Sequence, residues 1–159
     1  LDAIEALAPA DPDPAFQRGR MLYEAGQYDR AADAFDRVVD LNPRHADGRL
    51  WRAAAYCQLG LYDLAADEVD HTLTLGLGRA SDFFWRGQAR AHLREFEDAL
   101  SDFDQSARLD PSDAVTQTWR GWVLIELGRW EEARAAYREH ASEDVLGRRW
   151  RTLLEDLSS

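Results

Sequence analysis

Small and apolar residues recur along this chain with a period of 34 residues. The tripeptide Trp-Arg-Gly begins at Trp85 and again at Trp119, and the near copy Trp-Arg-Ala begins at Trp51. When the third residue of each copy is numbered position 8 of a unit, position 17 is always aromatic, position 20 always Ala and position 24 always large and apolar. The residues at these four positions are Gly19, Tyr28, Ala31 and Phe35; Ala53, Tyr62, Ala65 and Val69; Gly87, Phe96, Ala99 and Phe103; and Gly121, Trp130, Ala133 and Tyr137. A fixed period of this length indicates a repeat architecture.

The period divides the chain into four units, at 12–45, 46–79, 80–113 and 114–147. Each unit contains two helical stretches separated by a turn, which in the first unit is centred on Gly26. The small residues at positions 8 and 20 allow the two helices to approach closely, and the large residues at positions 17 and 24 fill the space between them. One unit cannot bury its own apolar face, whereas stacked units can. The pattern therefore predicts an all-α stack of helix pairs.

Local signals predict where some helices begin and how the ends of the stack are covered. Asp13-Pro14 predicts a helix start, with Asp as N-cap and Pro as first helical residue, and Asp110-Pro111-Ser112 predicts a helix exit followed by a new cap at Ser. Residues 1–11 are interpreted as a helical remnant. In residues 148–159 an apolar stripe at helical spacing predicts a capping helix over the fourth unit. That stripe consists of Trp150, Leu153, Leu154 and Leu157.

The complete pattern resembles the tetratricopeptide repeat (TPR) family, which has a small residue at position 8, Gly at 15, an aromatic residue at 17, Ala at 20, a bulky residue at 24 and Pro at 32. Position 32 is Pro43 in the first unit and Pro111 in the third, but Leu77 and Val145 in the other two. Position 7 departs from the family, since it is Arg in all four units. The resemblance implies a right-handed superhelical array of antiparallel helix pairs. It also implies a non-catalytic scaffold that binds peptides in a concave groove.

A helix turns about 100° per residue, so positions 2, 5, 9, 12 and 13 of each first helix share the face opposite to the one that packs on the second helix. Position 6, the recurring Trp, leans from this face toward a neighbouring helix. More than half of the residues at these positions are apolar or aromatic, which is typical of a binding surface. The candidate groove residues are Phe16, Arg20, Tyr23, Leu50, Trp51, Phe84, Trp85, Gln88, Trp119, Trp122 and Glu126. The alternative is that the tryptophans fill the seams between units, and both interpretations stay open at this point.

The chemistry of this face indicates what kind of partner it would bind. Arg20 is its only firmly basic residue, so a clamp for a C-terminal carboxylate is not expected. An apolar or amphipathic helix, or an aromatic-rich extended segment, fits better. An acidic rim favours basic flanks on that partner. The rim residues are Asp13, Glu24, Asp47 and Glu126. Two other functions remain open, a self-associating structural module that forms homo-oligomers and a regulatory fragment of a larger protein.

The recurring Arg at position 7 has a matching acid at position 25 in the first three units. We expect each Asp to pair with the Arg of the following unit, across the seam. The expected pairs are Asp36 with Arg52, Asp70 with Arg86 and Asp104 with Arg120. In the fourth unit position 25 is Arg138.

Composition and charge exclude several other functions. The net charge of −11 opposes binding to a nucleic-acid backbone. Cys57 is the only cysteine, which excludes an intrachain disulfide and favours a cytoplasmic location. No apolar run is long enough to span a membrane. The four histidines lack metal-ligand spacing, and no catalytic arrangement is visible, so no enzyme activity, metal or cofactor is expected. These histidines are His45, His71, His92 and His140.

Overall fold

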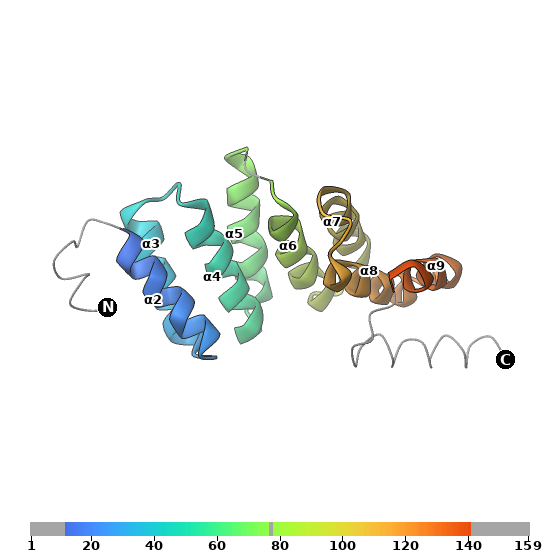
Figure 1. The fold of residues 1–159 in the computed structure, drawn as a ribbon, viewed down its shortest axis with the longest axis horizontal. Coiled ribbons are helices and arrows are strands. Elements are labelled where there is room, and N and C mark those ends of the chain that lie inside the picture. Colours follow the sequence, from blue (N-terminus) through green and yellow to red (C-terminus); the bar gives the residue numbers. More distant parts are fainter. Residues whose placement is uncertain (1–11, 77, 141–159) are drawn as a thin grey trace.

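The structure is a computed structural model that describes residues 12–76 and 78–140, and within that part of the chain it contains eight helices and no strand (Figure 1). The helices form antiparallel pairs that follow one another along the long axis of the molecule. The first helices of the pairs are α2 (Pro12–Glu24), α4 (Ala46–Leu59), α6 (Ala80–His92) and α8 (Ala114–Glu126). The second helices are α3 (Tyr28–Leu41), α5 (Tyr62–Thr74), α7 (Phe96–Leu109) and α9 (Trp130–His140). The predicted all-α array of helix pairs is confirmed.

Some sequence predictions concern parts of the chain outside the described residues. These parts are the helical remnant at 1–11, Leu77, the end of the fourth unit and the capping helix at 148–159. Two predicted helix starts are wrong by one or two residues. Helix α2 begins at Pro12 rather than after an Asp13 cap, because a proline is favourable at the first helical position wherever it stands. The cap of α8 is Asp113, whose carboxylate accepts a hydrogen bond from Val115 N at 3.0 Å, rather than Ser112.

The turns within the pairs require a left-handed backbone conformation at position 15. Gly26, Gly60 and Gly128 adopt positive φ angles of 73°, 75° and 71° there. Arg94 occupies the same position of the third unit with a φ of 66°, a conformation that is unfavourable for a residue with a Cβ atom. Its guanidinium lies 5.4 Å from the ring centroid of Phe96, in cation–π geometry.

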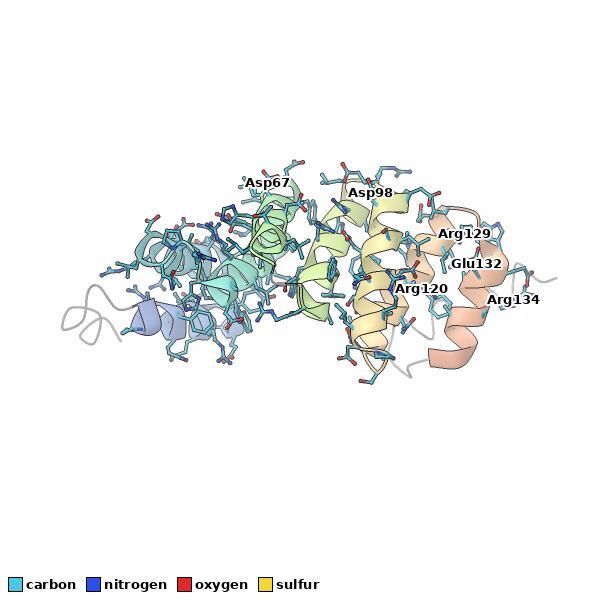
Figure 2. The ribbon with its side chains drawn as sticks, turned by 90° about the horizontal axis from the view of Figure 1, so that it is seen from above. Asp67, Asp98, Arg120, Arg129, Glu132 and Arg134 are labelled. Carbon is cyan, nitrogen blue, oxygen red and sulfur yellow. The ribbon has the colours of Figure 1, made fainter. Side chains whose placement is uncertain are left out.

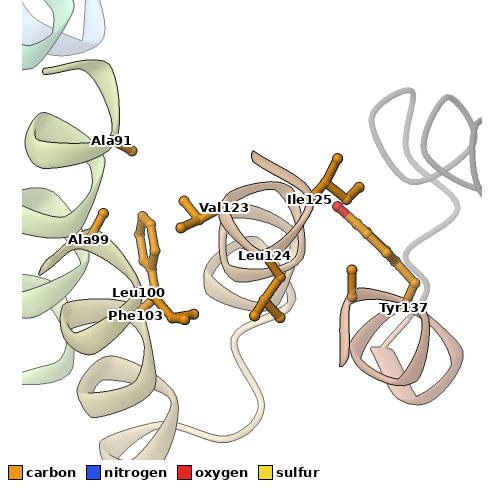
Figure 3. Close-up of a cluster of buried hydrophobic side chains, with 9 residues drawn as sticks. Ala91, Ala99, Leu100, Phe103, Val123, Leu124, Ile125 and Tyr137 are labelled. Carbon is orange, nitrogen blue, oxygen red and sulfur yellow. The ribbon is translucent and has the colours of Figure 1, made fainter. Parts of the chain in front are cut away.

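Each pair is closed by a large side chain at position 24 that lies against a small residue at position 8. Phe35 and Phe103 are fully buried, and a Cβ atom built on the facing Gly19 would lie 2.5 Å from the Phe35 ring. In the second unit the residue at position 24 is smaller. Val69 stands there and leaves room for the Cβ atom of Ala53 at position 8. Further apolar residues connect each pair to the next, as in the cluster around Phe103, Val123 and Leu124 (Figure 3). The core therefore runs as a chain of neighbouring clusters rather than as one central nucleus.

The three predicted Asp–Arg pairs across the seams are confirmed. Arg52 lies 2.5 Å from Asp36, and Arg120 lies 2.5 Å from Asp104. In the middle seam Arg86 donates to Asp70. These contacts repeat because neighbouring units are related by nearly the same displacement.

In the two middle units, Arg52 and Arg86 each bind a second carboxylate, at position 23 of their own unit. The sequence analysis did not identify these second pairs. Arg52 also pairs with Glu68. Arg86 forms a bidentate pair with Asp102, with bonds of 2.9 Å from Nε and 2.5 Å from Nη2. Arg90 also donates to Asp102, at 2.8 Å. Position 23 is Ala34 and Ala136 in the outer units, where that position offers no carboxylate.

Candidate peptide-binding face

The candidate site is the face of α2, α4, α6 and α8 that carries the eleven predicted groove residues, from Phe16 to Glu126, and it is called the binding face below. Because these helices alternate with the second helices along the array, they place the same positions of successive units next to one another (Figure 1). The structure decides how deeply each of these side chains is buried.

The three recurring tryptophans lie in the seams and are half-buried. The ring of Trp51 stacks on Phe35 of the preceding unit, with centroids 6.4 Å apart and planes inclined by 26°. Trp119 stacks in the same way on Phe103, at 6.1 Å and 28°. Trp85 packs against the cluster that contains Val69. Each indole therefore fills a seam against position 24 and still keeps part of its surface exposed.

A chain of aromatic contacts extends over the second half of the binding face. His92 stacks on Tyr62 with centroids 4.3 Å apart and planes inclined by 7°, and its ring edge meets Trp119 at 5.5 Å. Trp119 contacts Trp122 at 5.5 Å, and Trp122 contacts Phe96 at 5.9 Å. Burial lowers the pKa of His92, which favours the neutral ring in this stack near pH 7. Tyr62 and Phe96 come from second helices, and their constant aromatic character at position 17 was the signal that sequence analysis assigned only to the core.

A second aromatic group lies at the α2 end. Tyr23 meets Trp51 edge-on at 5.3 Å and Tyr28 at 5.2 Å. The Arg20 guanidinium lies 5.4 Å from the centroid of Trp51 and 3.7 Å from the carboxylate of Glu24. Burial raises the pKa of Tyr23 above its usual value, so its hydroxyl stays protonated at neutral pH. The one basic residue of the binding face is thus held over an indole and balanced by a neighbouring acid.

Several apolar residues predicted to lie on the binding face are buried in the structure and are not accessible to a partner. Leu50 is only 8% exposed, so its side chain belongs to the core and offers little surface to a partner. Other apolar residues that helical-wheel geometry places on this face are also buried by neighbouring helices. These are Ala54, Cys57, Ala91 and Ile125. Phe16 and Phe84 remain half-buried, with their rings 5.9 Å and 6.1 Å from Phe35 and Phe103.

The polar residues of the binding face differ in how they are paired. Glu24 and Glu126 are exposed, as an acidic rim requires. Asp47 is held by Arg79, which reduces its contribution to that rim and which sequence analysis did not identify. Gln88 is half-buried, and within the described part of the chain its Oε1 atom has no hydrogen-bond partner. The side chain of Asp13 is outside the described set.

The structure shows no sign of a metal site or a membrane span in the parts of the chain that it describes. Among residues 12–76 and 78–140, no three His, Cys, Asp or Glu side chains gather as metal ligands would. Over the same ranges, no helix is both long and apolar enough to cross a bilayer.

Cys57 lies beneath the binding face, and its burial predicts an unreactive thiol. Its sulfur donates to Trp85 O at 3.8 Å, and burial raises the pKa of the thiol to about 12. At pH 8 the thiolate fraction should be roughly a thousandfold below that of an unfolded cysteine. We expect a disulfide exchange reagent to label the native chain very slowly at pH 8, and the urea-unfolded chain at the rate of a free thiol. Rapid labelling without urea would contradict the burial of this side chain.

Comparison with known proteins decides the family. A family model described as "Tetratricopeptide repeat" matches residues 16–80 and 86–144, well over half of the chain. The chain belongs to the tetratricopeptide repeat family. The resemblance seen in the sequence is thereby confirmed, and the departure at position 7 is a variation within that family. No curated protein sequence matches the chain significantly.

Solved structures with the same fold include several tetratricopeptide repeat proteins. MamA (41-end) from Desulfovibrio magneticus RS-1 matches with a TM-score of 0.79 and 21% identity, over 85% of this chain and 76% of MamA. YrrB, described as a TPR protein with an unusual peptide-binding site, matches with a TM-score of 0.77 and 19% identity, over 90% of this chain and 74% of YrrB. The first TPR of Spaghetti (RPAP3), bound to the HSP90 peptide SRMEEVD, matches with a TM-score of 0.70 and 22% identity, over 74% of this chain and 93% of that structure. At these identities the likeness shows the fold alone.

Proposed function

We propose that this tetratricopeptide repeat chain is a non-catalytic protein-interaction scaffold that binds a peptide or a helix across its binding face. The observation that carries the proposal is the row of half-exposed aromatic rings on the first helices, from Tyr23 and Trp51 at one end to Trp119 and Trp122 at the other. Aromatic side chains of this kind supply large contact areas and dominate the energetics of many interfaces. The structures of YrrB, described with a peptide-binding site, and of RPAP3, described with a bound peptide, support a similar use of the fold.

The charge of the binding face favours a partner with an apolar or aromatic surface and basic flanks. Arg20 is the only basic residue among its eleven members, and it already pairs with Glu24. Glu126 adds an exposed carboxylate, and the whole chain carries a net charge of −11. An acidic peptide such as SRMEEVD would find few cationic groups here. Opposite charges at the rim would act on association rate and specificity more than on affinity.

The same proposal includes no catalysis, no cofactor and no nucleic-acid ligand. Tetratricopeptide repeats in general act as interaction modules rather than as enzymes. The carboxylates Glu131 and Glu132 stand at the start of a second helix, where they complement the helix dipole. The single cysteine fits a reducing compartment, and we propose the cytoplasm.

The test begins with peptides selected from a random library displayed on phage against the immobilised chain. We expect enrichment of aromatic or leucine-rich sequences flanked by Lys or Arg. In calorimetry with a selected peptide, Trp122→Ala should weaken binding by at least about thirtyfold, which corresponds to about 2 kcal/mol for an interface tryptophan. Glu126→Arg should weaken it by several-fold, mainly through a slower association rate.

Asp67→Ala is the matched control, because Asp67 is exposed on α5, a second helix (Figure 2). It should leave the affinity unchanged. Normal binding by Trp122→Ala, together with weakened binding by Asp67→Ala, would mean that the partner uses the second helices instead. Light scattering of the pure chain addresses self-association: a stable dimer whose formation requires Trp122 would favour the alternative of a homo-oligomeric module.

A further inference from the structure

The turn between α4 and α5 carries three exposed leucines, which are called the leucine patch below. Leu59 is the last residue of α4, Leu61 is the N-cap of α5 and Leu64 lies in the first turn of α5. Their exposed fractions are 39%, 44% and 47%. Leu61 and Leu64 stand three residues apart, so they lie on the same side of the helix start. A group of exposed apolar side chains is typical of an interaction site, whereas single ones occur on any surface.

The leucines at positions 16 and 19 are specific to the second unit. In the first, third and fourth units these positions are exposed and polar or charged, as Gln27 and Arg30, Glu95 and Asp98, and Arg129 and Glu132. In the first unit Arg30 donates to Gln27 Oε1 at 2.5 Å, and in the fourth Arg129 donates to Glu132 at 2.7 Å. The helix pair forms with charged residues at both positions, so the fold of a unit does not require leucine there.

Position 19 forms an ordered series along the first three units. It is basic in the first unit, apolar in the second and acidic in the third, as Arg30, Leu64 and Asp98. Because nearly the same displacement relates each unit to the next, these residues follow one another at similar spacing. Figure 1 shows the turns after α2, α4 and α6 along the same edge of the array. This edge therefore has an apolar centre with opposite charges on its two sides.

Such a series is complementary to itself under a twofold rotation. In a twofold interface the same patch serves both copies, and each contact between two different residues occurs twice. An axis through Leu64 places that residue against Leu64 of a second copy. The same rotation brings Arg30 of each copy opposite Asp98 of the other. Glu95, beside Asp98 at position 16, adds a second carboxylate for the incoming guanidinium.

We infer that the leucine patch, flanked by Arg30 and Asp98, is the interface of a twofold-symmetric dimer of this chain. No residue of this interface belongs to the eleven members of the binding face, so the dimer carries two binding faces and does not depend on the proposed function. Three partly exposed leucines per copy offer less area than a stable dimer buries. The association is therefore weak, with a dissociation constant on the order of 0.1 mM.

The test is sedimentation equilibrium of the full chain at concentrations up to about 1 mM. About 0.15 M salt screens the repulsion between the two negative chains beyond roughly 8 Å and leaves close ion pairs in place. We expect a reversible monomer–dimer equilibrium. Leu64→Glu should raise the dissociation constant at least about tenfold, because it sets two carboxylates against each other at the axis. Its fold should persist, since an acid is favourable in the first turn of a helix.

Charge exchange between two variants gives the sharpest outcome. Arg30→Asp alone and Asp98→Arg alone each bring like charges together twice, and each should weaken the dimer at least about tenfold. An equimolar mixture of these two variants restores opposite charges at both contacts. Its dissociation constant should lie within about threefold of the original value. The control is Asp40→Arg, the same charge change at an exposed residue near the other end of α3, which should leave dimerisation unchanged.

Three results would overturn the inference, provided that circular dichroism shows the variants folded. The first is a chain that stays monomeric up to about 1 mM. The second is a mixture of Arg30→Asp and Asp98→Arg that dimerises no better than either variant alone. The third is a dimer that survives Leu64→Glu and dissociates on Trp122→Ala, which would place self-association on the binding face instead.

Discussion

Replacing Asp102 with Ala should lower the free energy of unfolding by about 3–5 kcal/mol, because it removes the shared partner of two partly buried guanidinium groups. The Asp102 side chain is only 3% exposed, and it accepts hydrogen bonds from both Arg86 and Arg90. Without it, Arg90 loses its carboxylate, and Arg86 keeps only the more exposed Asp70. Urea unfolding followed by circular dichroism measures the loss.

Asp104→Ala is the matched control, two residues away on the same helix. Its side chain is 40% exposed and pairs with Arg120, so its removal should change the free energy of unfolding by about 0–1 kcal/mol. Equal losses for the two variants would show that the buried network around Asp102 contributes no more than a surface ion pair. A larger loss for Asp104→Ala would contradict the expectation that the buried carboxylate of Asp102 contributes more stability than the exposed one of Asp104.

Replacing Gly19 with Ala should also destabilise the chain, by about 1–3 kcal/mol, although Ala is the better helix former. The new Cβ atom would lie 2.5 Å from Cε1 of Phe35 and 2.8 Å from both Cδ1 and Cζ of that ring. Phe35 is fully buried, so its ring cannot move aside without disturbing its neighbours. Urea unfolding again gives the measurement.

The second unit supplies the control for this prediction, because there Ala53 faces Val69 without a clash. In a Phe35→Val background, Gly19→Ala should therefore be neutral or stabilise by up to about 1 kcal/mol, the helix-propensity difference. A double-mutant cycle measures the coupling. Additive effects of the two substitutions would mean that positions 8 and 24 do not constrain each other as the packing indicates.

Much of the fold could be predicted from the sequence because contacts in a repeat array depend on position within the unit. The period by itself places Phe35, Phe103 and Tyr137 against small residues, as the structure has them. It also identified the pairs of Asp36 with Arg52 and Asp104 with Arg120, since one displacement relates every unit to the next. The Pro12 start of α2 escaped prediction because two prolines satisfy the same local signal.

Burial on the binding face could not be predicted, because it depends on how closely neighbouring first helices approach. The helical wheel placed Leu50, Cys57 and Trp51 on one face, but the packing closes over the first two and leaves the third half-exposed. Side chains that reach between units were missed for a related reason. Arg79 meets Asp47 over a separation of 32 residues, a distance along the chain at which no local pattern marks a pair.

The sequence by itself determined the family, the helix pairs and the repeating contacts across the seams, because each of these follows from residue types at fixed spacing. Only the tertiary structure decided which residues of the binding face remain accessible, and that Glu68 and Asp102 join the arginine pairs. The physical reason is that periodicity specifies the direction of a side chain around its helix. What lies opposite that side chain, and at what distance, is set by the packing of other helices against it.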